Sequence, residues 1–206
     1  YFFHPDEEQA FLKACEHSQR DHCIFKVKFD TGLRISELVG DKRTGYPGLY
    51  FEDINLNTDP PEIRARGKGD KERMVLISRQ ATDEILRFLG DERSGKVFDI
   101  TPRMVQKLSR KYAKKAGLPD FFRCKKCSQR QIPEKIKACP KCGNTKLILE
   151  PRWSPHKCRH THITKIIVTT HDIALAQEQA GHASPATTSI YTHLDTEYRR
   201  PGMKKV

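Results

Sequence analysis

Residues 31–38 read TGLRISEL, and the break at Thr31-Gly32 separates two predicted helices. The first helix is predicted over residues 23–30, and the second begins near Ile35. Arg34 therefore stands at the start of a helix, directly after a turn. Taken alone, it would be interpreted as a solvated surface residue, as most arginines are. Whether Arg34 belongs to a functional site depends on the other basic residues of the chain.

A hairpin with a basic tip is predicted next. GKGDKER at residues 67–73 follows a predicted strand over residues 62–66 and runs into another over residues 72–77, and GKGD at residues 67–70 supplies the turn between them. Lys68 and Lys71 are expected at the tip, where they could enter a DNA groove. A solvated basic turn would have the same sequence.

His156 and Arg159 lie three residues apart in a predicted helix over residues 156–168. This spacing puts both side chains on one face, so an imidazole and a guanidinium can reach the same phosphate. A solvated basic helix start is one alternative. Zinc binding by His156 and His160 is another, but no Glu follows His156 to act as the base of a zinc protease.

Two more residues stand near the C-terminal end of the chain. His182 follows Gly181 at the end of a predicted helix that Asp172 caps, and Tyr191 follows a further predicted helix start. Alone, His182 would be a histidine that interacts with a helix dipole. Tyr191 alone would be a packing residue with a polar tip.

In this order and form, these groups resemble the catalytic domain of tyrosine recombinases, the phage integrase family. Arg159 precedes His182 by 23 residues, and His182 precedes Tyr191 by nine, as expected of the family. Glu37 matches the acidic residue that supports the first arginine of the family. Cys158 stands where a Leu is usual, and we interpret it as a small buried apolar residue.

The resemblance implies a site for phosphoryl transfer, which needs a nucleophile and positive donors aimed at the phosphate oxygens. Tyr191 would attack a scissile phosphodiester and form a 3′-phosphotyrosyl link, and Lys68 would protonate the leaving 5′ oxygen. Lys71 is the second choice, because an extra loop around residues 41–48 makes the hairpin register differ from the family pattern. The nonbridging oxygens would be held by Arg34, His156 and Arg159. His182 would assist them or help to position the tyrosine. Because the covalent link stores the bond energy, neither ATP nor a catalytic metal is expected.

Four of the seven cysteines form two C-x-x-C pairs separated by eleven residues: Cys124, Cys127, Cys139 and Cys142. Four thiolates at this spacing predict a zinc ribbon with one structural Zn²⁺, and redox chemistry is the alternative. A closed site of four thiolates leaves no position for a substrate, so no catalysis is assigned to it. Six basic residues lie in this segment: Lys125, Lys126, Arg130, Lys135, Lys137 and Lys141. The segment could contact DNA or a neighbouring protomer, and the sequence leaves both alternatives open.

The predicted fold is mainly α with a small antiparallel β-sheet (α+β), to which residues 49–54 would add a strand. We expect a catalytic domain in two parts, residues 1–117 and 154–206, with the zinc ribbon inserted as residues 118–153. The fold that the resemblance implies is that of the tyrosine recombinase catalytic domain.

The chain of 206 residues holds 38 Lys and Arg against 26 Asp and Glu, a formal charge of +12. A surface of this charge attracts polyanions, and double-stranded DNA is the leading partner. No apolar run is long enough to span a membrane and no signal-peptide pattern is present, so we expect a cytoplasmic, nucleoid-associated protein without a membrane partner. The chain begins at Tyr1, and we expect it to be part of a longer protein.

The functional prediction is a site-specific DNA recombinase of the integrase or Xer type, encoded by a mobile element or a chromosome-resolution system. The resemblance implies a homotetramer on two paired DNA sites. One alternative is a type IB topoisomerase-like enzyme, which would relax DNA without pairing sites. The other is a DNA-binding module without catalysis, in which the zinc ribbon is the working part.

Overall fold

The computed structural model describes residues 3–67, 72–118, 120–130, 132–133, 135–150 and 153–181. The helices are α1 (Pro5–Cys15), α2 (Gln19–Thr31), α3 (Ile35–Val39), the 3₁₀ turn η1 (Phe51–Asp53), α4 (Arg79–Leu89), α5 (Pro102–Lys115), α6 (Pro155–Thr170) and α7 (Ile173–Ala180). The strands are β1 (Ile54–Asn55), β2 (Glu62–Arg66), β3 (Glu72–Leu76), β4 (Phe121–Cys124), β5 (Ile132–Pro133) and β6 (Leu147–Glu150). The predicted class, mainly α with small antiparallel sheets, is confirmed.

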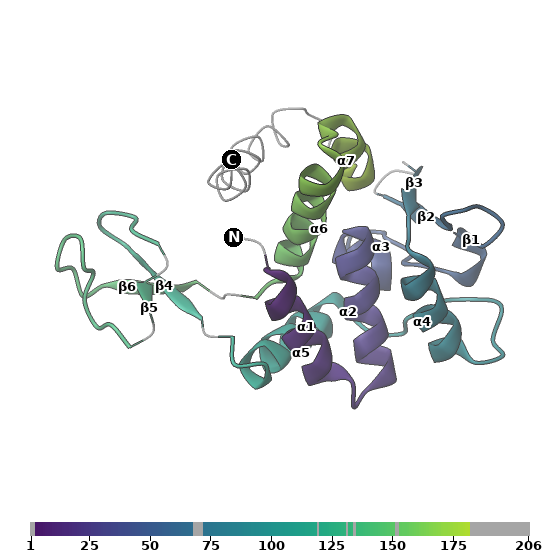
Figure 1. Cartoon of the computed structure of the whole chain (residues 1–206). Coiled ribbons are helices and arrows are strands. Elements are labelled where there is room, and N and C mark those ends of the chain that lie inside the picture. Colours follow the sequence, from purple (N-terminus) through teal and green to yellow (C-terminus); the bar gives the residue numbers. More distant parts are fainter. Residues whose placement is uncertain are drawn as a thin grey trace.

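Helix α2 is the centre of the main body, with α1, α4 and α6 packed around it (Figure 1). Its apolar residues Ile24, Phe25 and Val27 are completely buried. Phe11 of α1 stacks on Trp153, with ring centroids 3.7 Å apart. Because Trp153 lies just before α6, this stacking fixes where the last part of the chain returns to the core.

The first sheet has the order β1-β2-β3, and β2 and β3 form the predicted hairpin with Ile63 opposite Val75. Its tip, residues 68–71, lies outside the described residues. The prediction of a strand over residues 49–54 is wrong in the main: residues 51–53 form η1, and the strand is only Ile54–Asn55. Asp53 causes the turn, because its buried carboxylate accepts a hydrogen bond from the backbone N–H of Tyr50.

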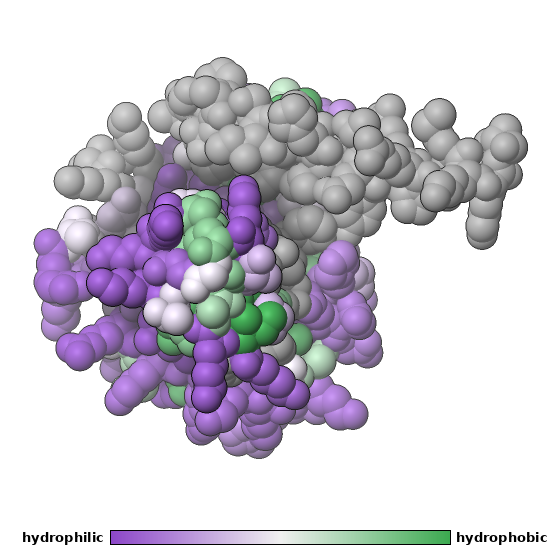
Figure 2. All heavy atoms as spheres, turned by 90° about the vertical axis from the view of Figure 1, so that its left-hand side faces the viewer, coloured by the Kyte–Doolittle hydropathy of each residue, from purple (hydrophilic) through white to green (hydrophobic). Residues whose placement is uncertain are grey.

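The cysteine segment is built separately from the main body and extends away from it (Figure 1). Its sheet has the order β5-β4-β6, and its small core is centred on Cys124, Ile132 and Cys139. Figure 2 looks onto this side and shows mainly hydrophilic side chains around a narrow apolar strip. The exposed apolar residues here include Ile136, Ile148 and Leu149. No helix in the described ranges is long and apolar enough to cross a membrane.

Candidate active site

The site begins where α2 ends. Gly32 caps the helix with a left-handed φ of +62°, and its N–H donates to the carbonyl of Lys28. A Cβ at position 32 would lie 2.7 Å from the Cδ2 atom of His162, so α6 packs against the turn at backbone distance. Both constraints favour glycine at this position. The predicted break at Thr31-Gly32 is confirmed, and it delivers Arg34 to the start of α3.

Arg34 is held by a carboxylate on its own helix. Its Nη1 donates to Glu37 Oε1 at 2.9 Å, and its backbone N–H donates to Glu37 Oε2 at 2.6 Å. The Glu37 side chain has no exposed surface, whereas that of Arg34 is 38% exposed. The exposed part of the Arg34 side chain can therefore contact a ligand, while Glu37 holds its backbone and one guanidinium nitrogen in place.

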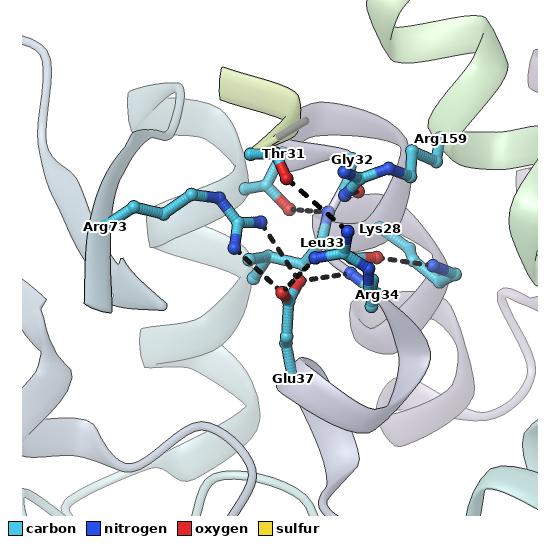
Figure 3. A network of polar contacts seen from close by, with 9 residues as sticks. Lys28, Thr31, Gly32, Leu33, Arg34, Glu37, Arg73 and Arg159 are labelled. Atoms are coloured by element: carbon cyan, nitrogen blue, oxygen red, sulfur yellow. Dashed lines mark hydrogen bonds and ion pairs between the residues drawn. The ribbon is translucent and has the colours of Figure 1, made fainter. Parts of the chain in front are cut away.

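A second arginine binds the same carboxylate. Arg73 of β3 donates from Nη1 and Nη2 to the two oxygens of Glu37, at 2.8 and 3.0 Å. Arg73 and Arg34 thus approach Glu37 from two sides (Figure 3). Burial opposes the charge on Glu37, but the hydrogen bonds and charges of Arg73 and Arg34 outweigh it and lower the carboxyl pKa to about 2.

Arg159 comes from α6 and lies deeper. It is only 6% exposed, and its Nη1 donates to the carbonyl of Gly32 at 2.9 Å. Its Nη2 is buried and has no hydrogen-bond partner among the described residues. Burial, together with the charges of Arg34 and Arg73, lowers its pKa to about 10. A buried guanidinium with an unused donor is suited to an anionic ligand.

His156 lies one helical turn before Arg159 on α6 and is exposed. Partial burial and then the charges of Lys28, Arg159 and Arg34 lower its pKa, so the neutral imidazole is favoured at neutral pH. His156 also lines a cleft of about 290 Å³ between α6 and the cysteine segment, which Arg130, Lys157 and His160 line as well. The structure therefore brings His156 into the same electrostatic environment as the two predicted arginines.

The C-terminal end of α7 lies next to Arg34 and Arg73. Gly181 caps the helix at a φ of +59°, and its carbonyl lies 3.5 Å from Nη2 of Arg34. A Cβ on Gly181 would lie 2.7 Å from Nε of Arg73. Gly181 directly precedes His182, the first of the predicted site residues at the C-terminal end. Four residues with predicted roles lie outside the described residues: Lys68, its alternative Lys71, His182 and Tyr191.

Sequence reasoning missed two members of this group, Arg73 and Lys28. Lys28 is 1% exposed, and its Nζ donates to the carbonyl of Leu33 at 2.6 Å. A signal was present, because residue 28 follows Ile24 by four positions on the buried side of α2. Arg73 carried no such signal, because strand alternation cannot tell an arginine bound to a carboxylate from one in solvent.

The four predicted metal ligands come together. The Sγ atoms of Cys124, Cys127, Cys139 and Cys142 lie within 4.8 Å of one another. Two of the separations are 3.5 and 3.6 Å, close to the roughly 3.8 Å between sulfurs of a tetrahedral Zn²⁺ site with bonds of about 2.3 Å. The side chain of Asn144 and the N–H of Lys126 donate to Sγ of Cys124, which favours its thiolate form. This donor set fits a structural metal ion.

The cysteines outside this cluster are buried in the main body. Cys158 has no exposed surface, as predicted for a small apolar substitute. Burial raises its pKa to about 12, so it is a thiol at neutral pH and not a nucleophile.

Comparisons with known sequences cover most of the chain. A family model described as the phage integrase family matches residues 1–198. The tyrosine recombinase XerD of Lacticaseibacillus casei is 31% identical over 179 residues, which make up 87% of this chain and 52% of that protein. The tyrosine recombinase XerA of Pyrococcus horikoshii is 28% identical over an alignment of 211 positions, which covers 97% of this chain and 59% of that protein. The chain thus spans about half the length of the curated relatives it matches.

Solved structures show the same fold. The crystal structure of XerA recombinase aligns with 100% of this chain and 64% of its own, with a TM-score of 0.66 and 24% identity. The post-cleavage complex of the XerH site-specific recombinase bound to palindromic difH substrate aligns with 98% of this chain and 52% of its own, with a TM-score of 0.65 and 22% identity. The sequence match over nearly the whole chain and the agreement in fold lead to one assignment: the chain belongs to the phage integrase family.

Proposed function

We propose that the protein is a site-specific DNA recombinase that cleaves and rejoins DNA through a 3′-phosphotyrosyl link on Tyr191. The observation that carries the proposal is the excess of positive charge around Glu37. In the described part of the chain, Arg34 and Arg73 bond to this one buried carboxylate, and Lys28 and Arg159 lie close enough to interact with its charge. Such a group has the charge and the free donors to bind a phosphate.

In the proposed mechanism, the hydroxyl oxygen of Tyr191 attacks the phosphorus atom and forms a new P–O bond. The bond from phosphorus to the 5′ oxygen breaks, and Lys68 gives that oxygen its proton. Arg34, Arg159 and His156 hold the nonbridging oxygens, where charge accumulates in the transition state. His182 assists them or positions the tyrosine. Attack by the 5′ hydroxyl of another strand then reverses the reaction and completes strand exchange.

We further propose that the partner is double-stranded DNA and that a homotetramer assembles on two paired sites. The net charge of +12 supports a polyanionic partner. The XerH recombinase, which shares the fold, was crystallised with its difH substrate. An enzyme acting on chromosomal or mobile-element DNA would work in the cytoplasm, associated with the nucleoid.

The domain boundaries and the metal belong to the same proposal. Residues 118–153 would be an inserted zinc ribbon, flanked by catalytic-domain parts at residues 1–117 and 154–206. Two observations support this division: the cysteine segment has its own small core, and the chain re-enters the main core at Trp153. The four thiolates would hold one Zn²⁺, whose role is to fix the ribbon in place of a larger core.

The decisive experiment is capture of DNA on the protein under denaturing conditions. The longest natural chain is incubated with nicked fragments from its native replicon, and the modified peptide is identified by mass spectrometry. We expect DNA on Tyr191 and none with Tyr191→Phe. If no adduct forms, the result would favour a DNA-binding module without catalysis. An adduct on Tyr198 would show that the C-terminal alignment is wrong. Relaxation of supercoiled DNA with repeated turnover and without site pairing would indicate a topoisomerase instead.

A further inference from the structure

Lys28 is a buried ammonium that the proposed mechanism leaves without a task. It lies in the last turn of α2, between the completely buried Val27 and Phe29, which is 1% exposed. Placing a charged amine in such a position costs free energy unless hydrogen bonds or other charges compensate. Its Nζ donates to the carbonyl of Leu33 at 2.6 Å. The position therefore needs an explanation beyond packing.

Among the residues that the structure describes, the groups around Lys28 do not neutralise its charge. Helix α6 presents Cys158, which is a thiol at neutral pH, and the cation Arg159. The exposed His156 on the same helix also feels the charge of Lys28, which lowers its pKa. Helix α3 presents Glu37, but both oxygens of that carboxylate are bound by Arg34 and Arg73.

Lys28 and Arg159 act on neighbouring points of the backbone. Arg159 donates to the carbonyl of Gly32, and Lys28 donates to the carbonyl of Leu33. The residue that follows these two carbonyls is Arg34. Figure 3 shows both cations directed at the turn that carries Arg34. The turn is thus held by two buried positive charges, both on the side of the predicted phosphate site.

From this geometry we infer that Lys28 is a positioning residue of the active site, an inference that rests on the proposed function. Its hydrogen bond to Leu33 fixes the backbone in front of Arg34. Its charge adds to the positive field that receives the scissile phosphate. Lys28 does not touch the DNA in this role and acts through Arg34 and through the electric field.

The role predicts a distinctive pH dependence. Burial, and to a lesser extent the charge of Arg159, lowers the pKa of Lys28 to about 8, against the opposing charge of Glu37. The ammonium is therefore present below about pH 8 and is lost as the pH rises through that value. A variant that keeps the hydrogen-bond donor but lacks the charge should be slower than the wild type at low pH and equal to it at high pH.

The test is single-turnover cleavage of a nicked substrate by the full-length protein, measured from pH 6.5 to 9.5. At protein concentrations too low to saturate the substrate, the pH profile of the rate reports the groups of the free protein. Lys28→Gln keeps a hydrogen-bond donor without the charge, and Lys28→Met removes both. We expect Lys28→Gln to be about tenfold slower at pH 7, as for one unit charge lost near the phosphate. Lys28→Met should be slower still, because it also loses the hydrogen bond to Leu33. The ratio of wild-type to Lys28→Gln rates should approach one at pH 9.5. Lys26→Gln, which removes the same charge from a partly exposed position of the same helix, should stay within about twofold throughout.

A second measurement uses the wild type and does not depend on the folding of a variant. The Lys28 ammonium is followed by NMR in protein with isotope-labelled lysine, with and without a duplex that carries the recombination site. Bound phosphate should raise the pH at which Lys28 loses its proton. A constant rate ratio between pH 6.5 and 9.5, or no change in the Lys28 titration on binding DNA, would overturn the inference for Lys28 and leave the Tyr191 chemistry standing. A wild type that forms no adduct would overturn the proposed function and this role together.

Discussion

Glu37 organises the site at the scale of single residues. Its carboxylate has no exposed surface, yet it binds Arg34 and Arg73 and stays ionised. Removing one partner of such a buried group would leave an uncompensated charge, which costs far more than losing an exposed ion pair. The position of Arg34 therefore depends on a carboxylate that is itself fully buried.

Acid should weaken the fold through Glu37. Its pKa is lowered from 4.5 to about 2 in the folded protein, so its contribution to stability is complete above about pH 4.5 and is lost as the pH falls towards 2. The contribution is on the order of 3 kcal/mol. Urea unfolding at a series of pH values should show Glu37→Gln less stable at pH 7 and less sensitive to pH below 4.5 than the wild type.

The exposed Glu16 provides the matched control. Because Glu16 lies at the solvent-facing end of α1, Glu16→Gln should change the unfolding free energy by no more than about 0.5 kcal/mol. A Glu37→Gln protein with the wild-type stability and pH profile would contradict the assignment of Glu37 as a buried, ionised group.

At the scale of elements, the short apolar or amphipathic helices were predictable and one strand was not. Helix α5 has Thr101 as its N-cap and Pro102 at its first position, a start signal that lies in the local sequence. Residues 49–54 contain β-forming side chains, but Asp53 also binds Arg64 and Arg66 of β2. Those contacts come from a neighbouring strand, and no local pattern reveals them.

Metal removal should unfold the cysteine segment and leave the main body folded. The two have separate cores, and the proposed metal would hold a segment of this size together in place of a larger core. We expect a chelator to release one Zn²⁺ per chain and to make the four clustered thiols reactive towards alkylation. Cys15, Cys23 and Cys158 should stay protected, because burial raises their pKa values.

Mass spectrometry of the alkylated peptides distinguishes the outcomes, and the helical circular dichroism signal reports the main body. Loss of that signal together with the metal would show that the segment is part of one cooperative unit. Alkylation of all seven cysteines in the metal-loaded protein would contradict the metal site itself.

At the scale of the whole molecule, the net charge of +12 should make the proposed DNA binding electrostatic in large part. If six phosphates are neutralised, the dissociation constant should rise by about a thousandfold between 50 and 200 mM salt. Titration of a fluorescent duplex at several salt concentrations measures this slope. Arg34→Ala should reduce the slope by about one, as for the loss of one phosphate contact. A salt-independent affinity would contradict the proposed interface.

The family, the fold class, the order of the basic groups and the spacing of the paired cysteines could be predicted from the amino-acid sequence alone. These follow from local spacing: glycine at a left-handed cap, residues one helical turn apart, and paired C-x-x-C knuckles. Only the tertiary structure showed that Arg73 shares Glu37 with Arg34, and that Lys28 and Arg159 hold neighbouring carbonyls. These contacts join α2, α3, β3 and α6. A hydrogen bond between distant segments depends on how the elements pack, and periodicity within one segment carries no information about its partner in another.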